Sequence, residues 1–426
     1  MRFDRYGQLR PAAPVSWLRQ PSVEFTQICP FSAATADEDD LAAALFPDAS
    51  HRHTAAGSYE AAYVGHVAED GFRAGGSSGG MVSWVLAELF RRGVIDGAAH
   101  VVPGAEPTRD RFFHYRISRD VAAVRAGAKS RYYPVDMAGV LREIREVPGR
   151  YAVVGVPCFI KAVQLQRRHD PVLRERIVAT LGLFCGHMKS ARFVESFAWQ
   201  MDVPIGDVQA VEFRLKDVTR PASTYTAQLT RRDGSAAKRD WWNLVDGDWG
   251  AGFFQHSACN ACDDVVGETA DISFGDAWVE PYSSDGNGTN VIVVRSASLA
   301  ALLTEAIADG RLALEPVDGD FVERTQAAGL RQRREGLAYR LTWHRRGSDL
   351  PKRVAARRRV AARRKLIYRM RSAISWWSHR VFWLAAATRR PGLYTRWAHG
   401  AQTVYHALAY SRGRLGTIVD RWLPTP

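Results

Sequence analysis

The sequence predicts an α/β fold with a mixed sheet flanked by helices, a strand- and loop-rich segment that bears cysteines, and a basic helical C-terminal extension. Three observations favour this class. Helical and strand patterns alternate over residues 71–200, short strand patterns precede and follow a CxxC motif in residues 205–300, and residues 331–426 hold 23 Lys and Arg against 3 Asp and Glu. The basic character therefore belongs to the C-terminal extension, because the rest of the chain is slightly acidic.

The predicted elements follow one another in the order that a layered α/β domain requires. Residues 1–70 are loop-rich, with one short acidic helix around Asp37 to Leu45. Apolar spacing then predicts helices over 81–92, 136–146, 160–168 and 190–201, and strands near 100–102 and over 151–156 and 177–184. The predicted domains are an N-terminal segment 1–70, a core 71–330 and a basic tail 331–426.

Composition is typical of a globular protein that works in a reducing compartment. The chain has 426 residues, of which 46% are hydrophobic, enough for a substantial core. Its five cysteines are neither dense nor evidently paired, and residues 1–30 lack the apolar stretch of a secretion signal. The sequence has no run of about 18 apolar residues. We therefore expect a cytoplasmic protein without a spanning helix.

Four cysteines are placed where a soft metal centre would need them. Cys158 follows the apolar run 151–157, Cys185 follows the run 180–184, and Cys259 and Cys262 form a CxxC motif. Because runs of this kind are typical of strands buried on both faces, we expect Cys158 and Cys185 to end strands at one sheet edge. The CxxC loop would then complete the four thiolates of an iron–sulfur site. The alternatives are ordinary buried thiols, a redox pair, or half of a zinc site.

A glycine-rich run at residues 75–80 leads directly into the predicted helix 81–92. Glycine lets backbone amides approach a phosphate, and the N-terminus of the following helix offers free N–H groups. The run lacks the GxGxxG spacing of a dinucleotide-binding loop, and a flexible turn before a Ser-capped helix is the alternative.

Several short motifs in this order resemble the coenzyme F420 hydrogenase/dehydrogenase beta-subunit family. They are 73–80 (RAGGSSGG), 155–158 (GVPC), 182–187 (GLFCGH), 258–264 (ACNACDD) and 269–278 (TADISFGDAW). Motifs at 213–223 and 286–290 also resemble a branch associated with bacterial polysaccharide gene clusters. The resemblance implies a flavoprotein with FAD and a [4Fe-4S] cluster that passes electrons between a reduced carrier, such as coenzyme F420 or ferredoxin, and a substrate.

The resemblance also implies roles for particular residues. Cys158, Cys185, Cys259 and Cys262 would hold the iron–sulfur cluster. His187 is a candidate proton donor, because it lies two residues from a predicted ligand and histidine titrates near neutrality. The candidate cofactor contacts are Gly76, Ser77, Ser78, Gly79, Gly80, Lys129, Gly288, Thr289 and Asn290. The alternative for loop 285–290 is a plain turn into a strand, and for Lys129, Ser130, Lys216, Arg220 and His187 it is a solvated or salt-bridged side chain.

The N-terminal segment departs from the resembled family. Many members carry an N-terminal ferredoxin segment with repeated cysteines, whereas this segment has only Cys29. One cysteine cannot hold a cluster, so we expect Cys29 to be structural. Electrons would then come from a separate electron-donor protein or directly from a reduced coenzyme.

Residues 350–366 of the basic tail have the residue pattern of an amphipathic helix, and aromatic residues follow up to 384. Arginine blocks beside tryptophans suit an anionic membrane surface or an acidic protein partner, which residues 350–390 would contact. A helical hairpin packed on the core is one alternative. Nucleic-acid binding is another and is disfavoured, because no base-reading motif accompanies the charge.

Two classes of function follow from these patterns. The preferred one is an iron–sulfur flavoprotein oxidoreductase of the F420 hydrogenase beta-subunit type, cytoplasmic or peripheral to the inner face of the membrane, acting in or beside polysaccharide biosynthesis. The alternative is a non-enzymatic, metal-bound accessory protein that its basic tail tethers to a membrane or partner. A bound flavin would distinguish the two, because an accessory scaffold has no need of one.

Overall fold

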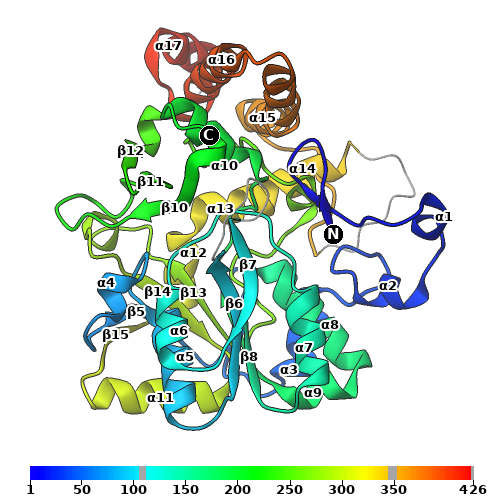
Figure 1. The fold of residues 1–426 in the computed structure, drawn as a ribbon, viewed down its shortest axis with the longest axis vertical. Helices are drawn as coiled ribbons and strands as arrows, with labels where there is room; N and C mark the ends of the chain where they lie inside the picture. Colours follow the sequence, from blue (N-terminus) through cyan, green and yellow to red (C-terminus); the bar gives the residue numbers. More distant parts are fainter. Residues whose placement is uncertain (105–111, 344–352, 424–426) are drawn as a thin grey trace.

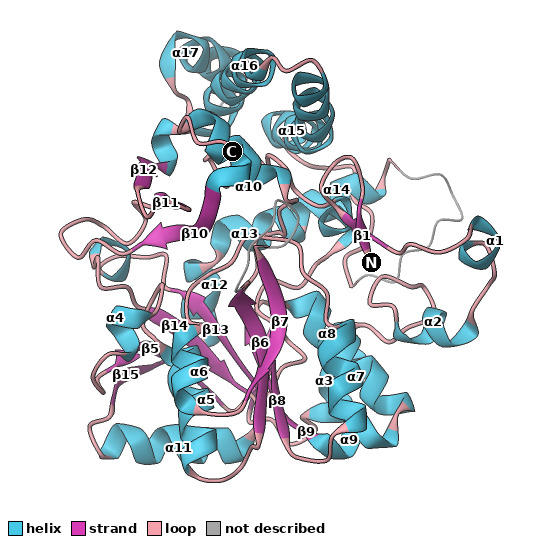
Figure 2. Cartoon of the chain, viewed as in Figure 1, coloured by secondary structure: helices cyan, strands magenta, loops and turns pink. Residues whose placement is uncertain are grey.

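The computed structural model describes residues 1–104, 112–343 and 353–423, and its main element is an eight-stranded mixed sheet (Figure 1; Figure 2). Four neighbouring strands, β13, β9, β8 and β6, are parallel, and antiparallel strands extend the sheet on both sides. In spatial order the strands are β15 (Leu312–Val317), β5 (Ala61–Val67), β14 (Asn290–Val294), β13 (Ile272–Asp276), β9 (Ile177–Leu183), β8 (Tyr151–Gly155), β6 (Gly97–Pro103) and β7 (Phe113–Ser118).

Helices cover both faces of this sheet. In strand β8, Ala152 and Val154 pack with α5 (Met81–Arg91), α6 (Val121–Ala126) and α11 (Ala297–Ala308). The alternate residues Tyr151 and Val153 pack with α7 (Ala138–Glu146), α8 (Pro157–His169) and α9 (Pro171–Arg176). Successive side chains of a strand point to opposite faces, so a sheet with two helical layers needs a continuous apolar run, which β8 has.

A second core joins the middle of the chain to the C-terminal extension. The antiparallel strands β10 (Val208–Leu215), β11 (Thr226–Arg231) and β12 (Ala236–Asp240) lie beside α10 (Arg192–Gln200). Buried residues of α15 (Ala362–Ala387) and α16 (Pro391–Tyr410), including Phe382 and Tyr394, complete the same core. Helix α17 (Gly413–Trp422) packs on α16. The extension is thus part of the packed molecule.

Short elements complete the described chain. The strands are β1 (Arg2–Phe3), β2 (Leu9–Arg10), β3 (His51–His53) and β4 (Gly57–Tyr59). The helices are α1 (Val15–Leu18), α2 (Val23–Ile28), α3 (Glu38–Leu45), α4 (Phe72–Gly75), α12 (Gly319–Thr325), α13 (Ala327–Arg333) and α14 (Glu335–Leu341). Among the described residues, no helix is both long and apolar enough to cross a bilayer.

The predicted mixed α/β fold is confirmed, and the helices expected at 81–92, 136–146 and 190–201 correspond to α5, α7 and α10. One prediction was wrong in a way that matters for the site. Helix α8 begins at Pro157, so Cys158 lies in its first turn and does not end a strand. Val156 is the extended N-cap residue, and proline suits the first helical position because its fixed φ matches the helix.

Two features show how the N-terminal segment and the tail join the core. Strand β5 lies before residue 71 yet pairs with β14 and β15 in the main sheet. In the tail, residues 353–361 form no helix, and α15 begins only at Ala362. Residues 350–352 of the expected helix lie outside the described residues. In this segment the partly buried Arg353 ion-pairs with Glu268 of the core at 2.6 Å, which ties the segment to the core.

Candidate functional site

The fold brings together the four cysteines that the sequence singled out. Cys158 comes from α8, Cys185 from the segment after β9, and Cys259 and Cys262 from the short 3₁₀ turn Ser257–Ala261 and its end. Burial raises the pKa of Cys158 well above its usual value, and the other three thiols nearby raise it further. Burial likewise raises the pKa of Cys185 to about 12 and of Cys262 to about 11. All four sulfurs therefore lie within electrostatic reach of one another.

The four sulfurs are farther apart than the sulfur ligands of a single zinc ion. Sulfur ligands of a tetrahedral zinc ion lie about 3.8 Å apart, since each Zn–S bond is about 2.3 Å. Among the described residues, the group whose metal-ligating atoms all lie within 4.8 Å of one another is His53, Asp320 and Glu323, and no three of the cysteines satisfy this limit. A polynuclear iron–sulfur cluster attaches each thiolate to a different iron, so it suits neighbouring but more widely spaced sulfurs.

Arg333, at the end of α13, holds the cysteine-bearing loops together. Its side chain is buried, and its guanidinium donates to the carbonyl oxygens of Gly186 at 2.5 Å and Cys259 at 2.9 Å. Longer contacts at 3.4 Å reach the carbonyl oxygens of Cys185 and Cys262. One side chain thus fixes loops that come from two distant parts of the sequence. Arg333 was not predicted as a site residue, because it lies among the many arginines of the basic tail.

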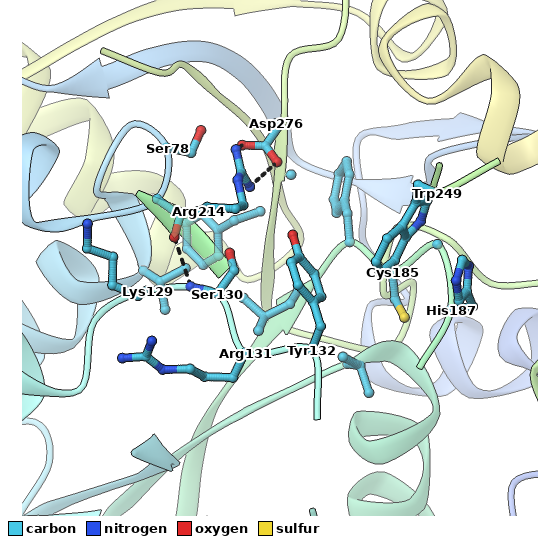
Figure 3. A pocket seen from close by; sticks show the side chains of 18 of the residues that line it. Ser78, Lys129, Ser130, Arg131, Tyr132, Cys185, His187, Arg214, Trp249 and Asp276 are labelled. Atoms are coloured by element: carbon cyan, nitrogen blue, oxygen red, sulfur yellow. Dashed lines mark hydrogen bonds and ion pairs between the residues drawn. The ribbon is translucent and has the colours of Figure 1, made fainter. Parts of the chain in front are cut away.

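A cavity of about 710 Å³ reaches the group of four thiols at Cys185. Cys185 lines it, and so do residues of the glycine-rich loop 76–80, so the two predicted sites open into one space. Figure 3 shows Ser78 and Lys129 on one side of this cavity and Cys185, His187 and Trp249 on the other. The volume falls in the upper part of the range for small-molecule and cofactor sites.

The glycine-rich loop meets the loop 285–290 in close packing. Gly80 has φ +86°, and a Cβ there would lie 2.6 Å from the Phe72 carbonyl. The Asn290 Oδ1 accepts from the backbone N–H of Met81 at 3.3 Å, at the N-terminus of α5. The predicted residues that line the cavity are Gly76, Ser77, Ser78, Gly80, Lys129 and Asn290. Gly79, Gly288 and Thr289 are absent from this described lining and lie in the packing between the two loops.

The polar candidates differ in what they already bind. Lys216 donates through Nζ to three loop carbonyls, those of Arg73, Ser78 and Asn287, at 2.5–3.0 Å, so it fastens the loops together. Arg220 forms an ion pair with Asp240 at 2.7 Å and is not among the described lining residues.

Lys129 and Ser130 belong to a loop that passes along the cavity. Lys129 pairs with Glu212 at 2.9 Å, and its φ of 111° is rare for a residue with a side chain. The Ser77 Oγ accepts from the backbone N–H of Ser130 at 2.8 Å. The glycine-rich loop and this loop are thus held in register on one wall.

His187 is buried at the thiol end of the cavity. Its ring stacks on Trp249 with centroids 4.2 Å apart, and Nδ1 lies 3.3 Å from the guanidinium of Arg371. Because arginine can only donate, Nδ1 accepts and the neutral ring carries its proton on Nε2. Burial lowers the pKa of His187 well below its usual value, and nearby cations lower it further. This direction runs against the predicted titration near neutrality, and Nε2, which is buried without a protein partner among the described residues, is a donor toward the cavity.

Two further residues on the cavity wall were not predicted as site residues. Arg214 of β10 and Asp276 of β13 form an ion pair at 2.9 Å, and the guanidinium lies 4.3 Å from the ring centroid of Tyr225. All three line the cavity. Arg214 and Asp276 belong to sequence motifs already noted at 213–223 and 269–278, so the motifs held the signal. The ion pair gives this wall a guanidinium and a carboxylate in fixed geometry, with their charges balanced.

Comparison with known proteins decides the family. Residues 62–142 match the coenzyme F420 hydrogenase/dehydrogenase beta subunit N-terminal model, and residues 149–320 match the C-terminal model of the same subunit. Together these matches cover more than half of the chain. The chain belongs to the coenzyme F420 hydrogenase/dehydrogenase beta-subunit family. The four cysteines and the glycine-rich loop of this family member lie within the matched residues, whereas Arg333 lies beyond them.

Similar proteins fit this family assignment. A subunit of the F420H2 dehydrogenase of Methanosarcina mazei is 27% identical over 213 residues, which is 48% of this chain and 55% of the relative. An uncharacterized protein of Methanocaldococcus jannaschii is 25% identical over 270 residues, 58% of this chain and 64% of the relative. The chain thus spans less than two thirds of the length of each relative.

A solved structure shares the fold. It is a chain of the xenon-derivatized F420-reducing [NiFe] hydrogenase complex from Methanosarcina barkeri, 18% identical, with a TM-score of 0.54. The match covers 71% of this beta-subunit-like chain and 99% of that chain. At this identity the likeness is one of fold.

Proposed function

We propose that this protein is an iron–sulfur flavoprotein oxidoreductase that passes electrons between a reduced carrier and a second substrate. The observation that supports this most directly is the shared cavity, because Cys185 and the glycine-rich loop 76–80 line the same space of about 710 Å³. A flavin in that space would lie beside Cys185, which is grouped with the other three thiols. Family membership supports the redox class, since the matched subunit belongs to hydrogenases and dehydrogenases.

The residues present suit both groups that the family implies. Cys158, Cys185, Cys259 and Cys262 provide four thiols that would hold a [4Fe-4S] cluster. The loop 76–80 and the N-terminus of α5 would receive the phosphates of FAD, since backbone N–H groups and the helix dipole favour negative charge there. When bound, a flavin would supply hydride acceptance and the release of single electrons.

The chain's own residues would then position and protect these groups. His187 would donate through Nε2 into the cavity from a neutral ring, because Arg371 occupies Nδ1. This arrangement supports a hydrogen-bonding role, in which His187 would act as a fixed donor. Trp249 stacks against His187, where its ring would shield the thiol end from water. Arg333 would hold the cysteine loops at the spacing that the cluster needs.

The ligand assignment can be tested with Cys259→Ser. We expect this variant, purified without oxygen and reconstituted with iron, sulfide and FAD, to lose most of its iron and to keep its flavin. Cys29→Ser is the matched control, because Cys29 lies at the end of α2 and is expected to keep full iron. Full iron in Cys259→Ser would contradict the assignment. A protein that binds metal but no FAD after reconstitution would favour the accessory role over the enzyme.

The reduced carrier is proposed to be coenzyme F420, a ferredoxin or a similar donor. The support is the name of the Methanosarcina mazei relative and the family description. Mixing the oxidised, reconstituted protein with each donor in turn would show which one bleaches the flavin absorbance. No bleaching by any reduced coenzyme or ferredoxin would contradict the electron-transfer role.

A role beside polysaccharide biosynthesis is proposed from the motifs at 213–223 and 286–290. These motifs pack together, since a Cβ on Gly286 would lie 2.3–2.8 Å from the carbonyl oxygens of Asp217, Val218 and Arg220. Reoxidation of the reduced protein by oxidised nucleotide sugars, measured as return of the flavin absorbance, would support this substrate class. Reoxidation by none of them would contradict it.

A further inference from the structure

Helix α15 exposes aromatic residues on the face that points away from the core. Trp376, Trp377, Trp383 and Leu384 are 49%, 48%, 40% and 49% exposed. Their spacing of i, i+1, i+7 and i+8 places them on one side of the helix. The opposite side, which includes Phe382, is buried in the second core. Helix α15 is therefore apolar on two sides, and the described residues cover one of them.

A shallow groove continues this face toward α16. It has a volume of about 430 Å³ and is lined by Met370, Ala373, Ile374, Trp377, Arg396, Trp397, Gly400, Ala401 and Val404. Trp377 belongs to both the exposed face and the groove. Eight of these nine lining residues are uncharged, so exposed indoles and an apolar groove form one continuous surface, which we name the α15 face.

The charge of this region has one sign. Residues 353–423 contain 16 Lys and Arg and a single acidic residue, Asp420. Asp420 is neutralised within the chain, because it ion-pairs with the buried Arg363 at 2.6 Å. Arg353, Arg363 and Arg371 are engaged inside the protein. Others are exposed, among them Arg389, Arg390, Arg396, Arg412 and Arg414.

We propose that the α15 face docks on an anionic lipid bilayer. Tryptophan side chains prefer the interface between headgroups and acyl chains, and exposed arginines attract anionic headgroups. A bilayer of this kind offers apolar depth and negative charge together, which matches both properties of the face. Fewer arginines can contact lipid than the sequence of the basic tail suggests, because Arg353, Arg363 and Arg371 bind groups within the protein.

Flotation with lipid vesicles tests this proposal on the full chain. We expect the protein to float with vesicles of phosphatidylcholine and phosphatidylglycerol, to bind pure phosphatidylcholine vesicles far more weakly, and to be released by high salt. Trp376→Ser with Trp377→Ser should weaken binding about tenfold or more, because the indoles no longer enter the interface. Arg389→Gln with Arg390→Gln should weaken it about 30-fold, from roughly fivefold per charge.

Matched controls separate the α15 face from general effects. Trp17 is 61% exposed on α1, far from α15 in Figure 1, so Trp17→Ser should bind as the unmodified chain does. Arg142→Gln, on the exposed side of α7, is the control for charge. Circular dichroism and iron content should be unchanged in all four variants, because none of the substituted side chains is buried.

Several outcomes would overturn the proposal. Equal binding to neutral and anionic vesicles, or unchanged binding of the double tryptophan variant, would remove the lipid role. Dimers that the tryptophan substitutions abolish, without vesicle binding, would assign the face to a second copy of the chain. The protein could instead bind duplex DNA as tightly as anionic vesicles, with no effect of the tryptophan substitutions. That result would show that the face binds polyanions through its positive charge alone.

Discussion

Replacement of Arg333 by glutamine tests how the cysteine loops are held. Arg333 is buried, and its guanidinium donates short hydrogen bonds to the carbonyl oxygens of Gly186 and Cys259. Glutamine is shorter and uncharged, so it cannot reach carbonyl groups on both loops. The two loops would lose their common partner, and buried carbonyl oxygens would be left without donors.

The expected cost follows from these contacts. A hydrogen bond from a charged donor contributes about 1.5–3 kcal/mol, so the two short bonds together contribute about 3–6 kcal/mol. A glutamine amide could keep one weaker bond, which lowers the expected loss in free energy of unfolding to about 3 kcal/mol. Arg333 also lowers the pKa values of Cys185 and Cys262 against the larger effect of burial. Its loss should therefore make thiolate formation, and hence iron loading, harder at neutral pH.

Urea denaturation of the metal-free protein would measure the stability, and iron per chain after anaerobic reconstitution would measure loading. Arg331→Gln is the matched control, because Arg331 lies in the same helix and is exposed. The reasoning would be refuted by an Arg333→Gln variant that unfolds at the same urea concentration as the Arg331→Gln control and takes up the same iron.

Three further predictions follow from other contacts. Gly80→Ala should lose FAD binding and about 1–3 kcal/mol of stability, because its φ is +86° and the new Cβ would meet backbone at 2.6 Å, whereas Gly75→Ala has open space and should bind FAD normally. Lys216→Met should cost about 2 kcal/mol in thermal unfolding and weaken FAD binding, since Nζ fastens three loop carbonyls. Hydrogen bonds from Arg311 hold the pKa of Glu88 at about 2, below its usual 4.5, despite burial. The stability contributed by Glu88 is thus present above pH 4.5 and lost as pH falls toward 2. In urea denaturation, Glu88→Gln should therefore lower the free energy of unfolding by about 2 kcal/mol at pH 7 and by progressively less below pH 4.5. A difference between the variant and the unmodified chain that stays constant with pH would contradict this.

Much of the fold could be predicted because its periodicities are local. The apolar run of β8 reflects burial against helices on both faces of the sheet, and the helical spacing of apolar residues in α5 reflects burial of one side of the helix on that sheet. The start of α8 was placed too late, because Val156 continues the apolar run of the strand while Pro157 already begins the helix. A proline at the first helical position was the signal that would have corrected it.

The site was predictable where a motif carried the chemistry and not where distant contacts did. The four cysteines could be grouped from their motifs, and the structure brings them together. Arg333, by contrast, is one of 23 basic residues in the last 96 positions, and nothing local marks it as buried. For His187, nothing local in the sequence signals the burial that lowers the pKa of its ring.

The central claim is that one chain holds both a flavin and an iron–sulfur cluster at the shared cavity. Its most direct test is to purify the protein without oxygen and to measure iron, acid-labile sulfide, zinc and released flavin in the same sample. The account predicts about four irons and four sulfides per chain together with FAD. A protein that holds zinc or no metal and no flavin, and that stays so after reconstitution with iron, sulfide and FAD, would contradict it.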